Sequence, residues 1–369
     1  MNTEAYHIER SDMNDDSPIV SVVLPSFNSE KTIERSIDSI VSQTYRNWEL
    51  LVVNDYGSDD TAEIIREYIQ KDPRIVLIQT HERFGLADSL NLGIALSRGK
   101  YIARMDSDDV SMPKRFEKQI RILDSDDRIG ICGTWQKHIG KTTWVHKAAK
   151  DDARCRAHLL FWCDLCHSTL MFRKQTFIDN DLRYDGSFEA EDYELWTRAM
   201  EYMRIVNIPE ILGNYYEDYG ITNFKLDSMS KENGCIVSKN LCRFFGIQLN
   251  DGEEHLFDQW NYSLTDDPER DEKLVALERI LRGIWRKNEE SNLFDNAALL
   301  ESLSTVWYKS RYDSNIGDRT FINPKRIDDI FDDRYISSKI IRYRVFRRIN
   351  RGLLKRIKGL FRILLNKQE

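Results

Sequence analysis

The chain of 369 residues lacks the features that mark membrane-spanning proteins and two large classes of nucleotide-binding enzymes. No apolar run approaches the ~20 residues that a membrane-spanning helix needs. No G-x-G-x-x-G and no G-x-x-x-x-G-K-[ST] motif follows an apolar run, which disfavours a dinucleotide dehydrogenase and a P-loop NTPase. The N-terminus is polar and acidic, without an apolar signal segment, so we expect a cytoplasmic protein with reduced thiols.

Three of the six cysteines lie near two histidines, between residues 155 and 167. Structural zinc sites usually separate two pairs of ligands by a dozen or more residues. Here only four residues separate His158 from Cys163. The spacing therefore disfavours a zinc site.

Charge is distributed unevenly along the chain. The formal net charge is −7, but residues 339–369 carry eleven Lys or Arg and one acid, which leaves 43 basic and 60 acidic residues in the first 338. An apolar content of 41% and a charged content of 31% are typical of a globular protein. We therefore expect an acidic globular body with a basic appendage.

Short apolar runs alternate with amphipathic segments over the first 125 residues. We expect strands at 19–25, 48–54, 75–79 and 101–105, and helices at 28–43 (capped by Asn28 or Ser29), 61–71, 86–97 and 114–124. This alternation predicts right-handed βαβ units and a mainly parallel sheet. A further strand is expected at 129–135, and residues 221–338 have a largely helical, charged pattern.

Polar residues gather where three of these strands end. Residues 25–28 close the first strand, Asp55 follows the second, and the D-S-D-D run at 106–109 follows the fourth. Ligands of such sheets bind beyond the carboxyl ends of the strands. Three carboxylates in four residues repel one another unless a cation joins them, and oxygen ligands suit Mg²⁺ and Mn²⁺. A solvated Asp-rich turn is the alternative for this run taken alone.

Five motifs in order make the chain resemble the family 2 glycosyltransferases, from about Ser17 to Tyr219. They are S-V-V-L-P-S-F-N at 21–28, V-N-D-Y-G-S-D-D-T at 53–61, Y-I-A-R-M-D-S-D-D at 101–109, L-L-F at 159–161 with H-S-T-L-M-F-R at 167–173, and E-D-Y-E-L-W at 191–196. The family usually has Tyr in place of Phe27, an acid in place of Asn54 and Gly in place of Tyr56. It often has Pro in place of Ser168.

The resemblance implies an α/β chain with the GT-A fold, a Rossmann-like, mainly parallel sheet flanked by helices, over residues 17–220. A helical C-terminal region would follow over 221–338. The implied activity is inverting, metal-dependent transfer of a hexose or N-acetylhexosamine from a nucleotide diphosphate donor, which we expect to be a UDP-sugar. The implied acceptor is a saccharide, lipid-linked in many similar bacterial enzymes, in O-antigen or capsule assembly.

Such a transfer needs a cation at the leaving diphosphate and a base at the incoming hydroxyl. By resemblance, Asp108 binds Mn²⁺ or Mg²⁺, and Asp106 contacts the ribose or the ion. Asp192 is the implied base, and Glu191 orients the substrate beside it. Favourable charge at a helix N-terminus is the alternative for both residues. Asp109 is expected to cap the following helix.

The nucleotide must also be held in register. The resemblance places Pro25 and Phe27 in the nucleotide loop, assigns recognition of the base to Asp55, and suggests a nucleotide contact for Arg83. Core packing is the alternative for Phe27, and a solvated loop charge is the alternative for Arg83. His167 is assigned to the diphosphate or the metal, with a structural histidine as the alternative.

The basic segment at 339–367 has apolar residues at helical spacing: Phe346, Ile349, Leu353, Ile357, Leu360 and Leu364. This pattern is typical of a helix that lies in an anionic membrane interface. We therefore expect a protein that is peripheral on the inner face of the cytoplasmic membrane. A docked terminal helix or the seam of a homo-oligomer is the alternative. Nucleic-acid binding is disfavoured, because no aromatic stacking platform accompanies the charge.

Two other functions compete with glycosyl transfer. A nucleotidyltransferase also uses an acid-rich α/β sheet, but its Gly-rich loop after the first strand is missing here. A catalytically inactive, membrane-bound scaffold is disfavoured because Asp106, Asp108 and Asp192 are intact. Release of UDP rather than pyrophosphate would separate the two enzymes, and any turnover would exclude the scaffold.

Overall fold

The computed structural model describes residues 5–11, 17–217, 226–258, 264, 267–311 and 326–331. The chain forms two compact units, Met1–Asn240 and Leu241–Glu369. The basic segment expected to contact a membrane lies outside the described residues. No described helix is long and apolar enough to cross a membrane.

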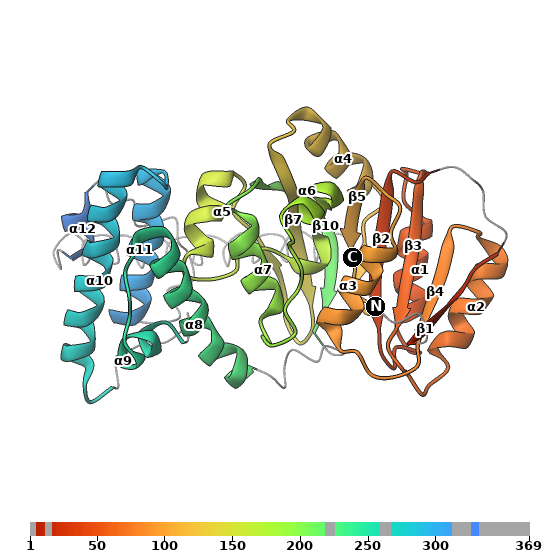
Figure 1. Cartoon of the computed structure of the whole chain (residues 1–369), viewed down its shortest axis with the longest axis horizontal. Coiled ribbons are helices and arrows are strands. Elements are labelled where there is room, and N and C mark those ends of the chain that lie inside the picture. The colour runs from red at the N-terminus through yellow and green to blue at the C-terminus, as the bar shows by residue number, and fades with distance from the viewer. Residues whose placement is uncertain are drawn as a thin grey trace, which may run out of the picture. The chain divides into compact units, whose positions relative to one another are not determined.

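A ten-stranded sheet organises the first unit, with the strand order β1-β4-β3-β2-β5-β9-β7-β10-β6 and β8 paired to β7 (Figure 1). Its strands are β1 (Tyr6–Glu9), β2 (Val20–Ser26), β3 (Trp48–Asn54), β4 (Ile75–Thr80), β5 (Tyr101–Arg104), β6 (Val110–Ser111), β7 (Ile129–Ile139), β8 (Thr143–His146), β9 (Met171–Arg173) and β10 (Arg204–Tyr216). β4, β3, β2 and β5 run parallel, which confirms the predicted α/β sheet.

Helices cover both faces of this sheet. They are α1 (Ile33–Val41), α2 (Thr61–Lys71), α3 (Leu86–Leu96), α4 (Arg115–Ser125), α5 (Asp152–Leu159), α6 (Lys174–Asp179) and α7 (Glu191–Ala199); α8 (Leu226–Phe245) follows. Alternation along β3 divides the core, because Leu50 and Val52 pack with α1 and α2, whereas Leu51 and Val53 pack with Leu92 of α3. Burial on both faces explains the continuous apolar runs.

The predicted cap of the first helix is wrong. α1 begins at Ile33 with Thr32 as its N-cap, four residues later than a cap at Asn28 would allow. Asn28 instead has φ of 50°, and its side-chain oxygen accepts a hydrogen bond from the Ser58 amide at 2.9 Å. A left-handed residue cannot sit in the β-region that an N-cap requires, so Asn28 turns the loop and the helix starts beyond it.

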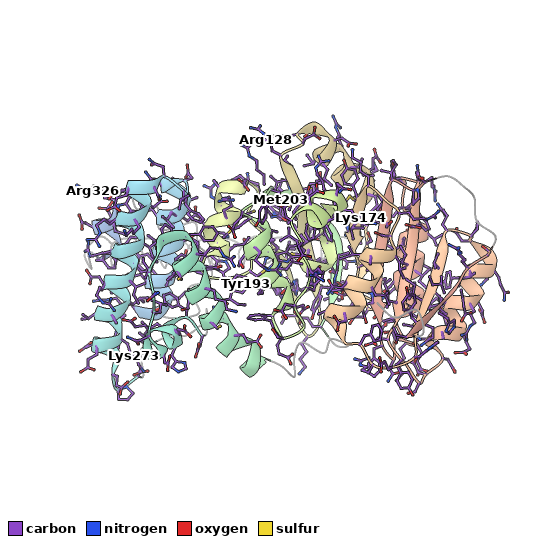
Figure 2. The ribbon with its side chains drawn as sticks, viewed as in Figure 1. Arg128, Lys174, Tyr193, Met203, Lys273 and Arg326 are labelled. Atoms are coloured by element: carbon purple, nitrogen blue, oxygen red, sulfur yellow. The ribbon has the colours of Figure 1, made fainter. Side chains whose placement is uncertain are left out.

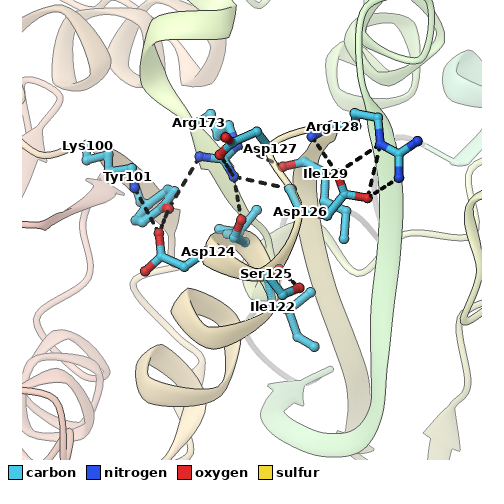
Figure 3. A network of polar contacts seen from close by, with 11 residues as sticks. Lys100, Tyr101, Ile122, Asp124, Ser125, Asp126, Asp127, Arg128, Ile129 and Arg173 are labelled. Carbon is cyan, nitrogen blue, oxygen red and sulfur yellow. Dashed lines mark hydrogen bonds and ion pairs between the residues drawn. The ribbon is translucent and has the colours of Figure 1, made fainter.

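Polar contacts fix the sheet at the end where β5 begins (Figure 3). Arg173 of β9 donates from Nε to the Ile129 carbonyl at 2.9 Å and from Nη2 to the Leu123 carbonyl. The Tyr101 hydroxyl donates to Asp124 Oδ1 at 2.5 Å. Nearby, Met203 (labelled in Figure 2) packs so closely on β7 that a Cβ on Gly130 would lie 2.4 Å from its sulfur. Loops follow the strands at the opposite edge, where β5 ends.

The second unit is helical in its described part. It contains α9 (Asp251–Glu254), α10 (Arg270–Ser291), α11 (Asn296–Arg311) and α12 (Ile327–Phe331). Its buried side chains include Leu277, Ile284, Leu303 and Trp307. Their spacing along α10 and α11 is that of one apolar stripe per helix.

Candidate active site

The carboxyl ends of β2, β3 and β5, with the loops that follow them, carry five of the nine predicted site residues. Pro25 is buried within β2, where it pairs with Val53 of β3, and Phe27 follows that strand. Asp55 follows β3, and Asp106 lies two residues beyond the end of β5. Because these three strands are parallel neighbours, their ends meet at one edge of the sheet.

Phe27, Asp55 and Arg83 form one cluster at this edge. The Arg83 guanidinium lies 3.3 Å from the centroid of the Phe27 ring, and its Nη1 is 3.1 Å from Asp55 Oδ2. The Phe27 residue is 39% exposed, so core packing does not explain it. Arg83 is held between a ring and a carboxylate, which is more than a solvated loop charge would show.

The Asp55 carboxylate also shapes the neighbouring loop. Its Oδ1 accepts from the Phe84 amide at 2.6 Å, and its Oδ2 accepts from the Gly85 amide at 2.9 Å. Gly85 has φ of 86°, a conformation that favours glycine. The buried carboxylate therefore fixes the loop in which Arg83 lies, in addition to any contact that it makes with a ligand.

Asp106 contacts a buried cation that the sequence analysis did not assign. Nη1 of Arg104, the last residue of β5, forms an ion pair with Asp106 Oδ2, and the Arg104 side chain is only 4% exposed. Burial works against its charge, but Asp106 raises the pKa of Arg104. Within the described part of the chain, Arg104 Nε is buried without a hydrogen-bond partner. A basic residue that ends an apolar strand just before three acids is the signal that could have identified it.

Of the other two acids of the D-S-D-D run, Asp109 is buried and Asp108 is half-buried. Burial and then the charge of Asp106 raise the pKa of Asp108 to about 6. The same two causes raise the pKa of Asp109 well above its usual range. The run is therefore not a solvated turn, and its carboxylates lack enough nearby positive charge to ionise freely.

Asp109 does not cap the following helix, so that prediction is wrong. α4 begins at Arg115, with Lys114 as its N-cap. Asp109 is buried and accepts hydrogen bonds from the Ser168 hydroxyl at 2.5 Å and from the Tyr216 amide at 3.3 Å. Ser168, which stands where the resembled family often has proline, therefore has a partner that proline could not contact.

Glu191 and Asp192 form the first turn of α7. Burial and the charge of Asp192 raise the pKa of Glu191 to about 8. Burial also raises the pKa of Asp192, whose Oδ1 accepts from the Tyr193 amide at 2.7 Å. Helix-terminal charge alone would favour the ionised forms. The raised pKa values show that burial outweighs that effect, as it does for many catalytic carboxylates.

His167 lies beside Asp192. Its Nδ1 is 3.9 Å from Asp192 Oδ2, and its Nε2 is 2.8 Å from the Tyr184 hydroxyl. Burial, followed by the charge of Arg104, lowers the pKa of His167 well below its usual range. A neutral ring with one nitrogen already bonded fits a residue that positions Asp192. Its predicted role as a metal ligand stays a prediction.

The start of α7 is held by a residue that the sequence analysis missed. Glu232 Oε2 accepts from the Glu189 amide at 2.7 Å and from the Ala190 amide at 3.0 Å. A carboxylate from α8 thus satisfies two backbone donors at this helix end. No local pattern links Glu232 to a segment about forty residues earlier, so only the fold reveals the contact.

The carboxylates at the end of β5 fit a divalent ion that a substrate helps to hold. Among the described residues, no group of three His, Cys, Asp or Glu side chains lies close enough to bind a metal by itself. Mg²⁺ is commonly bound by one or two carboxylates and completed by substrate phosphates. Asp106 and Asp108, which repel each other across a buried site, supply such a pair.

Comparison with known proteins identifies one family. Residues 21–189 match the family model described as "Glycosyl transferase family 2". An uncharacterised glycosyltransferase of Haemophilus influenzae is 33% identical over 212 residues, which are 54% of this chain and 65% of that protein. The chain therefore spans just under two thirds of that relative.

Two further relatives are covered over more of their length. The putative glycosyltransferase EpsE of Bacillus subtilis is 31% identical, with 63% of this chain matching 85% of that protein. The Escherichia coli protein WfgD, named "UDP-Glc:alpha-D-GlcNAc-diphosphoundecaprenol beta-1,3-glucosyltransferase", is 33% identical, with 50% of this chain matching 71% of it.

Among solved structures, TarS of S. aureus (residues 1–349, in complex with UDP-GlcNAc) has a similar fold. The TM-score is 0.54 at 17% sequence identity, and the match covers 79% of this chain and 86% of that one. At this level of identity the likeness concerns the fold alone. It agrees with the predicted GT-A architecture.

The buried Glu191 carboxyl predicts a pH-dependent change in stability. Its pKa is about 8 in the folded chain against an ordinary 4.5, so folding takes up a proton between these values. The free energy of unfolding should therefore fall as pH rises through this window. Glu191→Gln removes the effect. We compare the Tm of Glu191→Gln with that of the wild type in EDTA and without nucleotide. The two Tm values should be equal near pH 4.5, and that of the variant should be a few degrees higher toward pH 8.

Glu194→Gln is the matched control on the same helix turn. Glu194 Oε2 is 2.7 Å from Arg198 Nη2, so its loss should lower Tm rather than raise it. A Glu191→Gln difference that stays constant across the pH range would contradict the assignment of a raised pKa.

Proposed function

The chain belongs to glycosyl transferase family 2, and we propose that it transfers a sugar from a nucleotide diphosphate donor, with inversion, to a saccharide in surface-polysaccharide assembly. The observation that carries this proposal is the meeting of two acidic groups at one sheet edge. Asp106 and Asp108 lie at the end of β5, and the α7 pair lies close enough that the charge of Asp106 raises the pKa of both Glu191 and Asp192.

The proposed chemistry uses Asp192 as the base. A hydroxyl of the acceptor attacks the anomeric carbon of the donor, its proton passes to the Asp192 carboxylate, and the bond from that carbon to the diphosphate oxygen breaks. A raised pKa makes Asp192 a stronger acceptor of that proton while it can still ionise. The Tyr193 amide donates to the carboxylate and orients it, and His167 lies beside it. Glu191, buried beside Asp192, would orient the substrate there.

The leaving diphosphate gains negative charge during this step. A divalent ion held by Asp106 and Asp108 would neutralise that charge when bound. Arg104 supplies a second, permanent positive charge at the same edge of the sheet.

A uridine nucleotide is the proposed donor carrier. The exposed Phe27 ring offers a stacking face, and Arg83 beside it offers donors to a base or phosphate. The names of two similar proteins support this choice, since WfgD is named for UDP-Glc and TarS was crystallised with UDP-GlcNAc. The WfgD name also specifies a diphosphoundecaprenol-linked sugar, which supports a lipid-linked acceptor here.

A lipid-linked acceptor would suit a protein bound at the membrane surface. We assign that binding to the basic segment 339–367, on its sequence pattern alone. Removing residues 339–369 should abolish sedimentation with anionic liposomes, and the binding of the full chain should weaken with salt. The truncated protein could instead form a smaller assembly in light scattering and still bind liposomes. That result would assign the segment to an oligomer seam.

Two isosteric variants test the division of labour in the site. Asp192→Asn should keep binding of UDP with Mn²⁺ but lower kcat by at least about a hundredfold, because only proton removal is impaired. Asp108→Asn should lose both transfer and Mn²⁺-dependent UDP binding. The measurements are steady-state transfer and calorimetric titration with UDP, in Mn²⁺ and in excess EDTA.

Two outcomes would overturn these roles. Wild-type transfer by Asp108→Asn, or by the native protein in EDTA, would remove the metal from the proposal. Weakened donor binding by Asp192→Asn with kcat unchanged would make Asp192 a binding residue rather than the base.

A further inference from the structure

The hairpin formed by β7 and β8 carries a row of aromatic rings that the proposed transfer does not yet use. His138 of β7 lies opposite Trp144 of β8 and opposite Tyr215 of β10. The His138 and Trp144 rings are stacked with centroids 3.9 Å apart, and the His138 and Tyr215 centroids are 4.9 Å apart. We call these three residues the ring platform. Trp144 is 43% exposed.

The ring platform lies on the site's edge of the sheet. β9 is antiparallel to both β5 and β7, so β5 and β7 run in the same direction and end at the same edge. Gln136, two residues before His138 on the same face of β7, donates to Ser168 Oγ at 2.6 Å and lies 3.4 Å from Asp109 Oδ2. Two residues along a strand span about 7 Å. His138, where the platform begins, is therefore about 7 Å along β7 from Gln136, the residue that contacts the D-S-D-D run.

The platform and the Phe27 cluster lie on opposite sides of β5. In the strand order β3-β2-β5-β9-β7, the Phe27 cluster follows β2 and β3, and the platform is on β7 and its neighbours. The D-S-D-D run lies between them. Ser168, which Gln136 contacts, is also adjacent in sequence to His167, the neighbour of Asp192. A ligand on the platform would therefore approach the proposed base from the side opposite the nucleotide.

The chemistry of the platform suits an uncharged sugar ring. The Trp144 indole N–H donates to Glu217 Oε1 at 2.9 Å, which holds the indole in place. Burial, followed by the charge of His146, lowers the pKa of His138 to about 4, so the platform is neutral near pH 7. A pyranose presents an apolar face of C–H groups and a rim of hydroxyls. The three aromatic rings suit the apolar face of the sugar, and the Glu217 carboxylate suits its rim of hydroxyl groups.

We propose that the ring platform of His138, Trp144 and Tyr215 binds a pyranose unit of the acceptor saccharide by stacking. The proposal rests on glycosyl transfer as the proposed function, since it names the substrate that the platform holds. A pyranose stacked here would lie at the same edge of the sheet as the D-S-D-D run and would leave the nucleotide cluster free for the donor. Trp144, the exposed ring, provides most of the contact.

Saccharide binding can be tested without knowing the natural acceptor. The protein is labelled with ¹⁵N in its tryptophans, and the Trp144 indole signal is identified by its loss in Trp144→Phe. Cellobiose, maltose and N,N′-diacetylchitobiose are titrated separately into the full chain with UDP and Mn²⁺ present. We expect at least one disaccharide to shift the Trp144 signal, and saturation-transfer NMR to give its affinity.

Three variants separate stacking from general damage. Trp144→Ala should weaken binding of that disaccharide about fivefold or more, whereas Trp144→Phe, which keeps a ring, should retain most of it. Tyr202→Ala removes another exposed aromatic residue, 54% exposed and just beyond the far end of α7, and should bind as wild type does. All three should keep the wild-type affinity for UDP with Mn²⁺.

The proposal is overturned if none of the three disaccharides moves the Trp144 signal in the wild-type protein, or if Trp144→Ala binds as tightly as wild type. Failure of the proposed function would look different. The wild-type protein would then not bind UDP with Mn²⁺, whatever the disaccharides do. Melting temperatures of the variants confirm that each is folded when it is titrated.

Discussion

One buried guanidinium, that of Arg104, balances the acids of the active site. It pairs directly with Asp106, and its charge also lowers the pKa of Asp108, Asp109, Glu191 and Asp192. Those four pKa values stay raised even so, because burial outweighs the positive charge nearby. Each unpaired buried charge costs several kcal/mol. The free site therefore retains protons, as the raised pKa of Glu191 indicates, which fits the proposed binding of a cation.

This shortage of positive charge connects the fold to the proposed chemistry. The parallel strands bring Arg104 and the D-S-D-D run to the middle of the sheet edge. Arg115 keeps Arg104 in place, since it donates to the Arg104 and Leu170 carbonyls at 2.8 and 3.1 Å. The proposed nucleotide cluster and the ring platform lie on either side. A donor and an acceptor bound there would meet beside Asp106, Asp108 and the proposed base, Asp192.

Short-range patterns predicted much of this arrangement. Apolar runs identified β2 to β5, the α2 range was predicted to the residue, and the rule about strand ends placed Asp55 and Asp106 at one edge. The sequence could not show which groups are buried together. Asp109 looked like a cap until Ser168 and Tyr216, distant in sequence, proved to be its partners. The contacts of Glu232 and of the ring platform join elements that are distant in sequence, and no short-range sequence pattern predicts such contacts.

The central claim is that the site holds protons that a bound cation displaces. Calorimetric titration of the protein with Mn²⁺ and UDP near pH 7, repeated in buffers of different ionisation enthalpy, counts the protons released on binding. On binding, the wild-type protein should release more protons than Glu191→Gln does, by a substantial fraction of a proton. The amide of the variant carries no titratable proton. Equal proton release by the two proteins, at matched affinity for Mn²⁺ and UDP, would contradict this account.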